Sequence, residues 1–291
     1  MTHFTLVLPV AVALGLALVA TTTHRRLPPV VAARAVTTTL AIVATAAVPT
    51  LWIVSLGYVS HLPLLGGQLD WCAEALGVHD PIPTWIGAPA LLLSIAGIIR
   101  ATSVFRSYGR LRHDYPGEVE ITDHQQPFAF TLPGRGGQVV LSSGLVDLLD
   151  DAEQGVVLAH ERAHAYHRHD RYLLVAQLAA AVLPLMRPIA GRLQFSLERW
   201  ADETAVTHCG DRGFVARTLG KVALRGITPA RALSFAGLGV PARVAALLSP
   251  PMKPLRSGAH AALWVAITAT GMLAAFQIHH LARLVTALCP G

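Results

Sequence analysis

Long apolar runs are the feature that most constrains how this chain can fold, because a helix needs about 20 consecutive apolar residues to cross a bilayer core. Residues 4–22 and 36–59 meet that length. Residues 85–101 are shorter but begin at a tryptophan suited to the membrane interface, and residues 259–278 form the last candidate. These runs predict a mainly α-helical integral membrane protein with about four transmembrane helices.

Composition supports this prediction. Hydrophobic residues make up 53% of the 291 residues and charged residues only 14%, against about 25% charged residues in an ordinary soluble domain. The net charge is +6, but the arginines flank apolar runs instead of forming a stripe interleaved with aromatic side chains. We therefore expect the lipid bilayer as a partner and no direct contact with nucleic acid.

The basic residues also predict an orientation, since loops rich in lysine and arginine stay on the cytoplasmic side of a membrane. The loop after the first run carries three arginines, whereas residues 60–84 hold no lysine or arginine. Residues from about 101 to 258 are therefore expected to face the cytoplasm of a bacterial-type cytoplasmic membrane. On this topology Cys72 and Cys289 share the outer face, where they could pair.

Three parts follow from these runs. Residues 1–100 form an N-terminal transmembrane region, residues 101–258 a cytoplasmic domain, and residues 259–291 a C-terminal transmembrane helix with a short tail. Within the middle part, residues 172–186 form a short apolar run that has an arginine at each end. A short run with positive charge on both sides favours a helix that lies against the membrane or dips into it over one that spans it.

The cytoplasmic part opens with two strand-like segments. The segments "PFAFTL" and "QVVLSS" are separated by the turn "PGRGG", which predicts a β-hairpin or small sheet. Two helices are expected next, and the second begins near Asp150, Asp151 and Glu153. Acidic residues at this place favour a helix N-terminus, because they complement the positive end of the helix dipole.

The second of these helices carries the most informative motif, since His160, Glu161 and His164 spell HExxH. Residues four apart lie on one face of a helix, so both imidazoles can reach one metal ion while Glu161 addresses its bound water. Zinc suits two neutral imidazoles and a carboxylate, and a catalytic zinc site keeps one position for water. The motif predicts a Zn²⁺ site that hydrolyses amide bonds. The alternative is a histidine-rich helix end at a wet boundary.

A third ligand has to come from another segment. The stretch "SLERWADETAV" supplies Glu198, and Asp202 four residues later can accept the Nδ1–H of a ligand histidine. Asp202 or Glu203 in place of Glu198 is an alternative, and so is His167. Otherwise His167 and His169 are interpreted as solvent-facing or phosphate-facing, because three ligands on one straight helix strain a tetrahedral site.

The stretch from "FAFTLPGRGGQVVLSSGLVDLLDDAEQGVVLAHERAHAYHRHD" to "LERWADETAV" resembles the BlaR/MecR-like integral-membrane metallopeptidases and, more distantly, the HtpX-like membrane zinc proteases. The resemblance covers roughly residues 100–250 and implies a gluzincin-like zinc protease domain. It implies the zinc ligands His160, His164 and Glu198, the general base Glu161, and Asp202 as partner of a ligand histidine. It also places Arg243, in "VPARVAALL", near the site; a helix-capping or membrane-facing arginine is the alternative.

The resemblance further implies a substrate. BlaR/MecR-like proteins act on cytosolic repressors of the BlaI/MecI type, so we expect a repressor to be cut in a signalling pathway. The chain has no Ser-x-x-Lys motif and no extracellular penicillin-binding domain after its last apolar run, so we expect no β-lactam sensing by that route. The alternatives are HtpX-like quality control of membrane proteins and an inactive membrane scaffold or signalling partner, which Glu161 disfavours. A homo-oligomer is left open.

Overall fold

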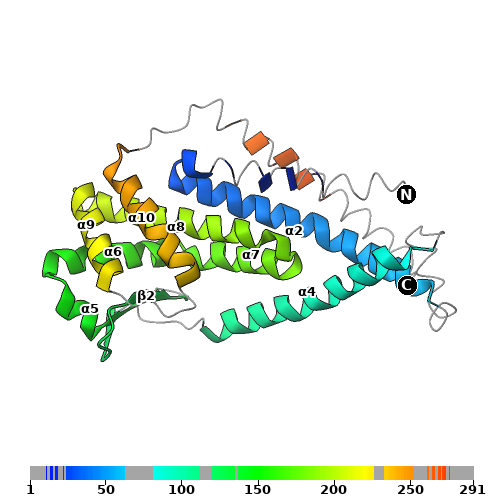
Figure 1. The fold of residues 1–291 in the computed structure, drawn as a ribbon, viewed down its shortest axis with the longest axis horizontal. Coiled ribbons are helices and arrows are strands. Elements are labelled where there is room, and N and C mark those ends of the chain that lie inside the picture. Colours follow the sequence, from blue (N-terminus) through cyan, green and yellow to red (C-terminus); the bar gives the residue numbers. More distant parts are fainter. Residues whose placement is uncertain are drawn as a thin grey trace.

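The computed structural model describes residues 24–62, 81–111, 119–134, 137–225 and 233–251. Isolated helical positions near both ends of the chain are described as well. Over these residues the fold is mainly helical, with one small sheet (Figure 1). The first and last predicted spans fall largely outside the described residues, as do Cys72 and Cys289, so these expectations stay predictions.

Two long helices, α2 (Pro29–Ser60) and α4 (Thr84–Leu111), pack against each other and contain the second and third predicted spans. Both are long and apolar enough to cross a membrane. In their interface the hydroxyls of Ser55 and Ser94 form a buried hydrogen bond of 3.0 Å. The described residues thus hold two of the about four membrane helices that the sequence predicts.

The outer face of α4 is apolar and uncovered. Leu92 and Ile99 expose 68% and 64% of their surface, and Trp85 at the start of the helix exposes 78%. Apolar surface of this extent is unusual in water, but it suits contact with lipid tails. This face is therefore the surface that a bilayer would cover.

The expected membrane-associated helix 172–186 lies beside these two helices. It falls in α7 (His169–Val182) and the 3-10 turn η2 (Pro184–Met186), and α7 packs on both α2 and α4. A Cβ added to Gly97 would lie 3.5 Å from the Cα of Val182. Because Gly97 is halfway along α4, the end of α7 lies level with the middle of that helix.

A nitroxide at Leu185, introduced by Leu185→Cys in a background without other cysteines, should therefore report a lipid environment. Leu185 lies in η2 and exposes 71% of its surface. If α4 spans the bilayer, this label should collide more often with oxygen, which concentrates in lipid, than with a water-soluble nickel chelate. A label at Gln125, an exposed loop position, should show the reverse. Equal access of the nickel chelate to both labels would place residues 172–186 outside the membrane.

The sheet has three strands, in the order β1-β3-β2. They are β1 (Val119–Thr122), β2 (Ala129–Leu132) and β3 (Gln138–Ser142). Strands β2 and β3 are antiparallel and lie on the two predicted hairpin segments, whereas β1 pairs parallel with β3 and is an addition to the predicted hairpin. Strand β2 lies at an edge, and in the described part of the chain β3 is its only strand partner.

Helix α6 (Asp151–Tyr166) begins where the acidic residues predict. Asp150 and Glu153 form a capping box, in which each side chain accepts the other's backbone N–H, at 2.8 and 3.1 Å. Near its end the helix contacts the hairpin closely. Gly137 has a φ of 63°, and a Cβ there would lie 2.4 Å from the Cβ of Ala165. Glycine adopts this positive φ readily and has no Cβ to clash with Ala165, so the hairpin can pack directly against the last turns of α6.

The remaining helices complete the described part of the chain, and one arginine joins three of them. They are η1 (His24–Arg26), α5 (Ser143–Leu148), α8 (Arg187–Cys209), α9 (Arg212–Arg225) and α10 (Leu233–Leu248). Arg212 donates to both oxygens of Glu203 at 2.6 and 2.9 Å, and to the carbonyls of Ala246 and Leu247 at 3.1 and 2.9 Å. These bonds fix the C-terminal end of α10 to α8, which sets the place of α10 over the site described next.

Candidate metal centre

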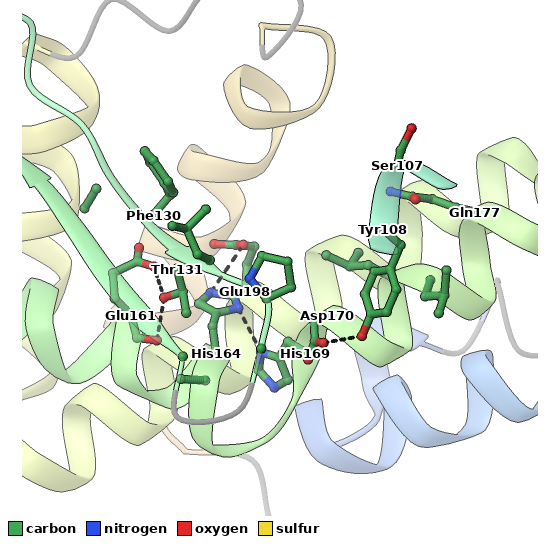
Figure 2. Close-up of a pocket in the computed structure, with 18 residues that line it drawn as sticks. Ser107, Tyr108, Phe130, Thr131, Glu161, His164, His169, Asp170, Gln177 and Glu198 are labelled. Carbon is green, nitrogen blue, oxygen red and sulfur yellow. Dashed lines mark hydrogen bonds and ion pairs between the residues drawn. The ribbon is translucent and has the colours of Figure 1, made fainter. Parts of the chain in front are cut away.

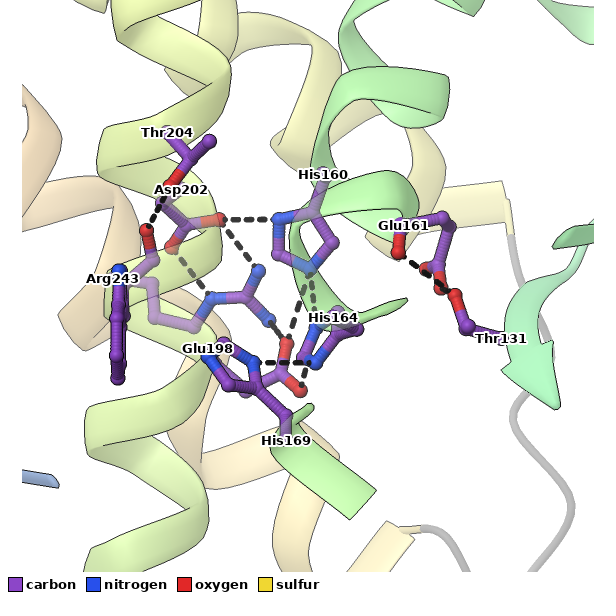
Figure 3. Close-up of polar contacts among 10 residues, drawn as sticks. Thr131, His160, Glu161, His164, His169, Glu198, Asp202, Thr204 and Arg243 are labelled. Carbon is purple, nitrogen blue, oxygen red and sulfur yellow. Dashed lines mark hydrogen bonds and ion pairs between the residues drawn. The ribbon is translucent and has the colours of Figure 1, made fainter. Parts of the chain in front are cut away.

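The two histidines of the HExxH motif point from one face of α6 toward α8 (Figure 3). Helices α6 and α8 pack against each other along this face. The Nε2 atoms of His160 and His164 lie 3.2 Å apart. Glu198, on α8, completes the group: its carboxylate lies 3.4 Å from His160 Nε2 and 3.6 Å from His164 Nε2. The structure thus brings the three predicted ligands together.

These separations suit a zinc ion. With bonds of about 2.0–2.1 Å, a tetrahedral zinc ion holds neighbouring ligand atoms about 3.3 Å apart. The two histidine nitrogens, 3.2 Å apart, are close to that value, and the two oxygens of Glu198 lie 3.4 Å and 3.6 Å from one histidine nitrogen each. Among the described residues, this is the group of histidine and carboxylate side chains whose ligand atoms converge on one point. The side chains present therefore fit a metal ion.

Asp202 sets the tautomer of His160. Its Oδ1 lies 3.1 Å from His160 Nδ1, and the carboxylate is almost completely buried. A carboxylate only accepts, so Nδ1 carries a hydrogen, and Nε2 is the nitrogen that faces Glu198 and His164 and that a metal ion would use. This is the role that the sequence predicts for Asp202; as a ligand in place of Glu198 it would face the wrong nitrogen.

His169 bonds the outer ring nitrogen of His164, as Asp202 bonds that of His160. The sequence did not predict this contact. Its Nδ1 lies 2.9 Å from His164 Nδ1, and only 1% of the residue is exposed. The expectation that His169 faces solvent or phosphate is therefore wrong. His167 lies outside the cluster, with its ring centroid 4.5 Å from that of Trp200. His169 follows the αL residue Arg168, so the helical spacing of α6 carries no signal for it.

Arg243, on α10, lies inside the site. Its Nε and Nη2 donate to the two oxygens of Asp202 at 2.8 and 2.7 Å, and its Nη1 lies 2.8 Å from Glu198 Oε2. Only 11% of its side chain is exposed. Arg243 therefore neither faces lipid nor caps a helix, which excludes the alternative interpretation of this residue. Glu203 is not part of the cluster, because both its oxygens bind Arg212.

The electrostatics of the cluster favour a positive charge at His160. Burial lowers the pKa of His160, but hydrogen bonds to Asp202 and Glu198 outweigh it and raise the pKa to about 10. Burial raises the pKa of Glu198, yet the Arg243 guanidinium holds that pKa well below its usual value. The pKa of His164 is lowered, chiefly by burial. Glu198 is thus an anionic ligand and His164 a neutral one, the forms that bind a metal ion.

Glu161 lies beside the cluster instead of within it. Figure 3 shows its side chain on the side of α6 that faces β2, pointing toward Thr131. The Thr131 hydroxyl donates to Glu161 Oε2 at 2.7 Å and lies 2.8 Å from the Glu161 carbonyl oxygen. Glu161 still lines the same pocket as His164 and Glu198, so a group in that pocket can reach all three.

That pocket has a volume of about 620 Å³ and lies between the sheet and the apolar helices (Figure 2). Edge strand β2 forms one wall with residues 129–132, and α7 forms another with Leu173 and Leu174. Helix α4 contributes Tyr108, whose hydroxyl donates to Asp170 at the start of α7, 2.6 Å away. The site therefore opens into a mostly apolar space that reaches the helix predicted to span the membrane.

The HExxH pair, the downstream glutamate and the neighbouring apolar helices define a membrane-associated metallopeptidase. A sequence profile of peptidase family M48 matches residues 107–271, more than half of the chain. The chain belongs to this family of metallopeptidases. The match covers α6, α8 and α10, and so includes all the residues of the cluster.

One curated relative agrees with the family. The chain is 33% identical over 78 residues to a protease HtpX homolog of Acidiphilium cryptum (strain JF-5). The matched stretch is 26% of this chain and only 27% of that relative. No solved structure matches the chain. Of the predicted resemblances, the membrane-type peptidase is confirmed, whereas the BlaR/MecR-like specificity stays a prediction.

Proposed function

We propose that this chain is a membrane-embedded endopeptidase whose zinc ion is held by His160, His164 and Glu198. The observation that carries the proposal is the convergence of these side chains: the Nε2 atoms of the histidines are 3.2 Å apart, and each lies 3.4 or 3.6 Å from an oxygen of Glu198, with the outer nitrogen of each histidine already bonded. Two imidazoles and one carboxylate leave a fourth position for water, as in catalytic zinc sites.

A zinc ion there would supply a Lewis acid that makes a water molecule acidic near neutral pH. Glu161 would serve as the general base beside this site, able to take a proton from an attacking water and to pass it to the leaving nitrogen. Asp202 and His169 keep the ligand nitrogens of His160 and His164 directed at one point. Arg243 uses its donors on Asp202 and Glu198, so its part is to position these two carboxylates.

Strand β2 supports an extended peptide as the substrate. It is an edge strand and forms a wall of the pocket beside Glu161 and His164. Unpaired backbone groups of an edge strand can hydrogen-bond a peptide as one more strand, and the side pockets then select side chains. The leucines of α7 on the opposite wall favour an apolar side chain next to the cut bond.

The finer substrate follows from resemblance. A cytosolic repressor of the BlaI/MecI type is the substrate that the BlaR/MecR-like resemblance implies, and a small winged-helix repressor gene beside this one would support it. Membrane-protein quality control is a second candidate, favoured by the match to an HtpX homolog and by the wall that α4 adds to the pocket. Offering the purified protein a repressor and a misfolded membrane protein would separate the two.

We place the site on the cytoplasmic side because the basic residues gather on that side of the predicted spans. In intact cells a thiol reagent that cannot cross membranes should spare a cysteine at Gln125, an exposed position of the peptidase domain, and should label one at His61, just past the end of α2. The reverse pattern of labels would overturn the cytoplasmic orientation.

Metal-dependent cleavage tests the proposed activity directly. Protein purified in detergent should cleave an unfolded protein such as reduced casein, lose this activity to a zinc chelator, and regain it with about one equivalent of zinc. The Glu161→Ala variant is the control for contaminating proteases. If every substrate that the wild-type protein cleaves in the presence of zinc is also cleaved by the Glu161→Ala variant, the chain is not an endopeptidase. The alternative of an inactive membrane scaffold is then favoured.

A further inference from the structure

Thr131 is a polar side chain of the pocket that the proposed mechanism does not use and that contacts Glu161. It lies on β2, thirty positions before Glu161 in the sequence, and its hydroxyl is 2.7 Å from Glu161 Oε2. The same hydroxyl is 2.8 Å from the Glu161 carbonyl oxygen. A hydroxyl has one proton, so at any moment it donates to either the carbonyl oxygen or the carboxylate of Glu161.

The place of this hydroxyl is fixed from two sides. Threonine is branched at Cβ, which restricts its χ1 angle on a strand. The hairpin that contains the strand is held against α6 at Gly137, just before β3, where a Cβ would clash with Ala165 and contact the Thr131 methyl at 3.5 Å. Strand β2 is therefore a rigid support, and Thr131 presents its hydroxyl to Glu161 from a defined direction.

We propose that Thr131 is a positioning residue for Glu161. By holding Oε2, its hydroxyl leaves Oε1 to receive the proton of the attacking water, and it restricts the carboxylate to one rotamer. Because β2 also forms the wall on which a peptide would lie, one strand aligns the substrate and the general base together. The inference rests on the proposed function, since it gives Glu161 the role of base.

Two substitutions separate this role from a structural one. Thr131→Val keeps the shape and removes the donor, and it should lower kcat about tenfold or more, as expected for the loss of a hydrogen bond to a charged group. KM and zinc content should stay near their wild-type values. Thr131→Ser restores the hydroxyl and should recover most of kcat. Thr122→Val, on the opposite edge strand β1, is the matched control and should change neither constant.

A binding measurement tests the same contact without turnover. Acetohydroxamic acid would bind a zinc ion as its anion, and Glu161 is the nearby group that can accept the proton it loses. Thr131→Val should weaken its binding in the wild-type background, and should have little effect in a Glu161→Gln background, because the two residues act through one contact.

Three results would overturn the inference. Thr131→Val could keep the wild-type kcat, or Thr131→Ser could fail to restore it, or Thr131→Val could weaken acetohydroxamate binding equally with and without Glu161. Each of these is measured against an active wild-type enzyme. Failure of the proposed function is a different result, in which the wild-type protein and the Glu161→Ala variant are equally inactive.

Discussion

Glu161→Gln should lower kcat by about 10³-fold, within the range that general acid–base catalysis contributes, while the purified protein keeps its zinc. The amide has the shape of the carboxylate but cannot take a proton from water. The Thr131 hydroxyl can still donate to the amide oxygen, so the local fold should stay. Zinc should stay because Glu161 lies outside the group of ligand atoms formed by His160, His164 and Glu198.

The measurement is kcat on an unfolded substrate, together with the zinc content per chain by elemental analysis. Glu120→Gln, on β1, is the matched control: Glu120 is exposed and bonds Gln138 at the far edge of the sheet, so neither value should change. A Glu161→Gln protein that loses its zinc would make Glu161 a ligand. A Glu161→Gln protein that keeps the wild-type kcat would show that Glu161 takes no part in catalysis.

The parts of the site that the sequence predicted are those that local spacing or known chemistry encodes. His160 and His164 are four residues apart on one helix, so their common face follows from helical geometry. The hairpin strands follow from two β-rich segments around a glycine-rich turn. Glu198 and Asp202 were found because the first ligand pair requires a carboxylate and a partner for a histidine.

The parts that the sequence did not predict depend on contacts between distant elements. Thr131 meets Glu161 only because the hairpin folds back onto α6, and no spacing encodes that contact. His169 turns back toward His164 because the chain leaves α6 through Arg168, in the left-handed conformation with a φ of 56°. The place of α7 next to α2 and α4 likewise comes from packing, since its own sequence fits several positions at a membrane.

Arg243→Met should destabilise the zinc-free protein by about 3–5 kcal/mol, as expected when one partner of a buried ion pair is removed. The guanidinium is the cation nearest to Asp202 and Glu198, whose side chains expose 4% and 28% of their surface. Without it, His160 is the remaining positive charge beside the two carboxylates in a poorly solvated space, and the pKa of each carboxylate rises because their negative charges are only partly balanced. Methionine fills a similar volume, so the loss of charge dominates the effect.

Zinc should remove part of this cost, because its two positive charges take over the balance that Arg243 provides. The thermal midpoint of Arg243→Met should therefore rise more on adding zinc than that of the wild-type protein does. Arg217→Met is the matched control: this arginine exposes 71% of its side chain and lies 3.9 Å from Asp211, so its loss should cost less than about 1 kcal/mol. If both variants lose the same stability, and zinc raises both midpoints equally, Arg243 does not balance the charge of the metal ligands.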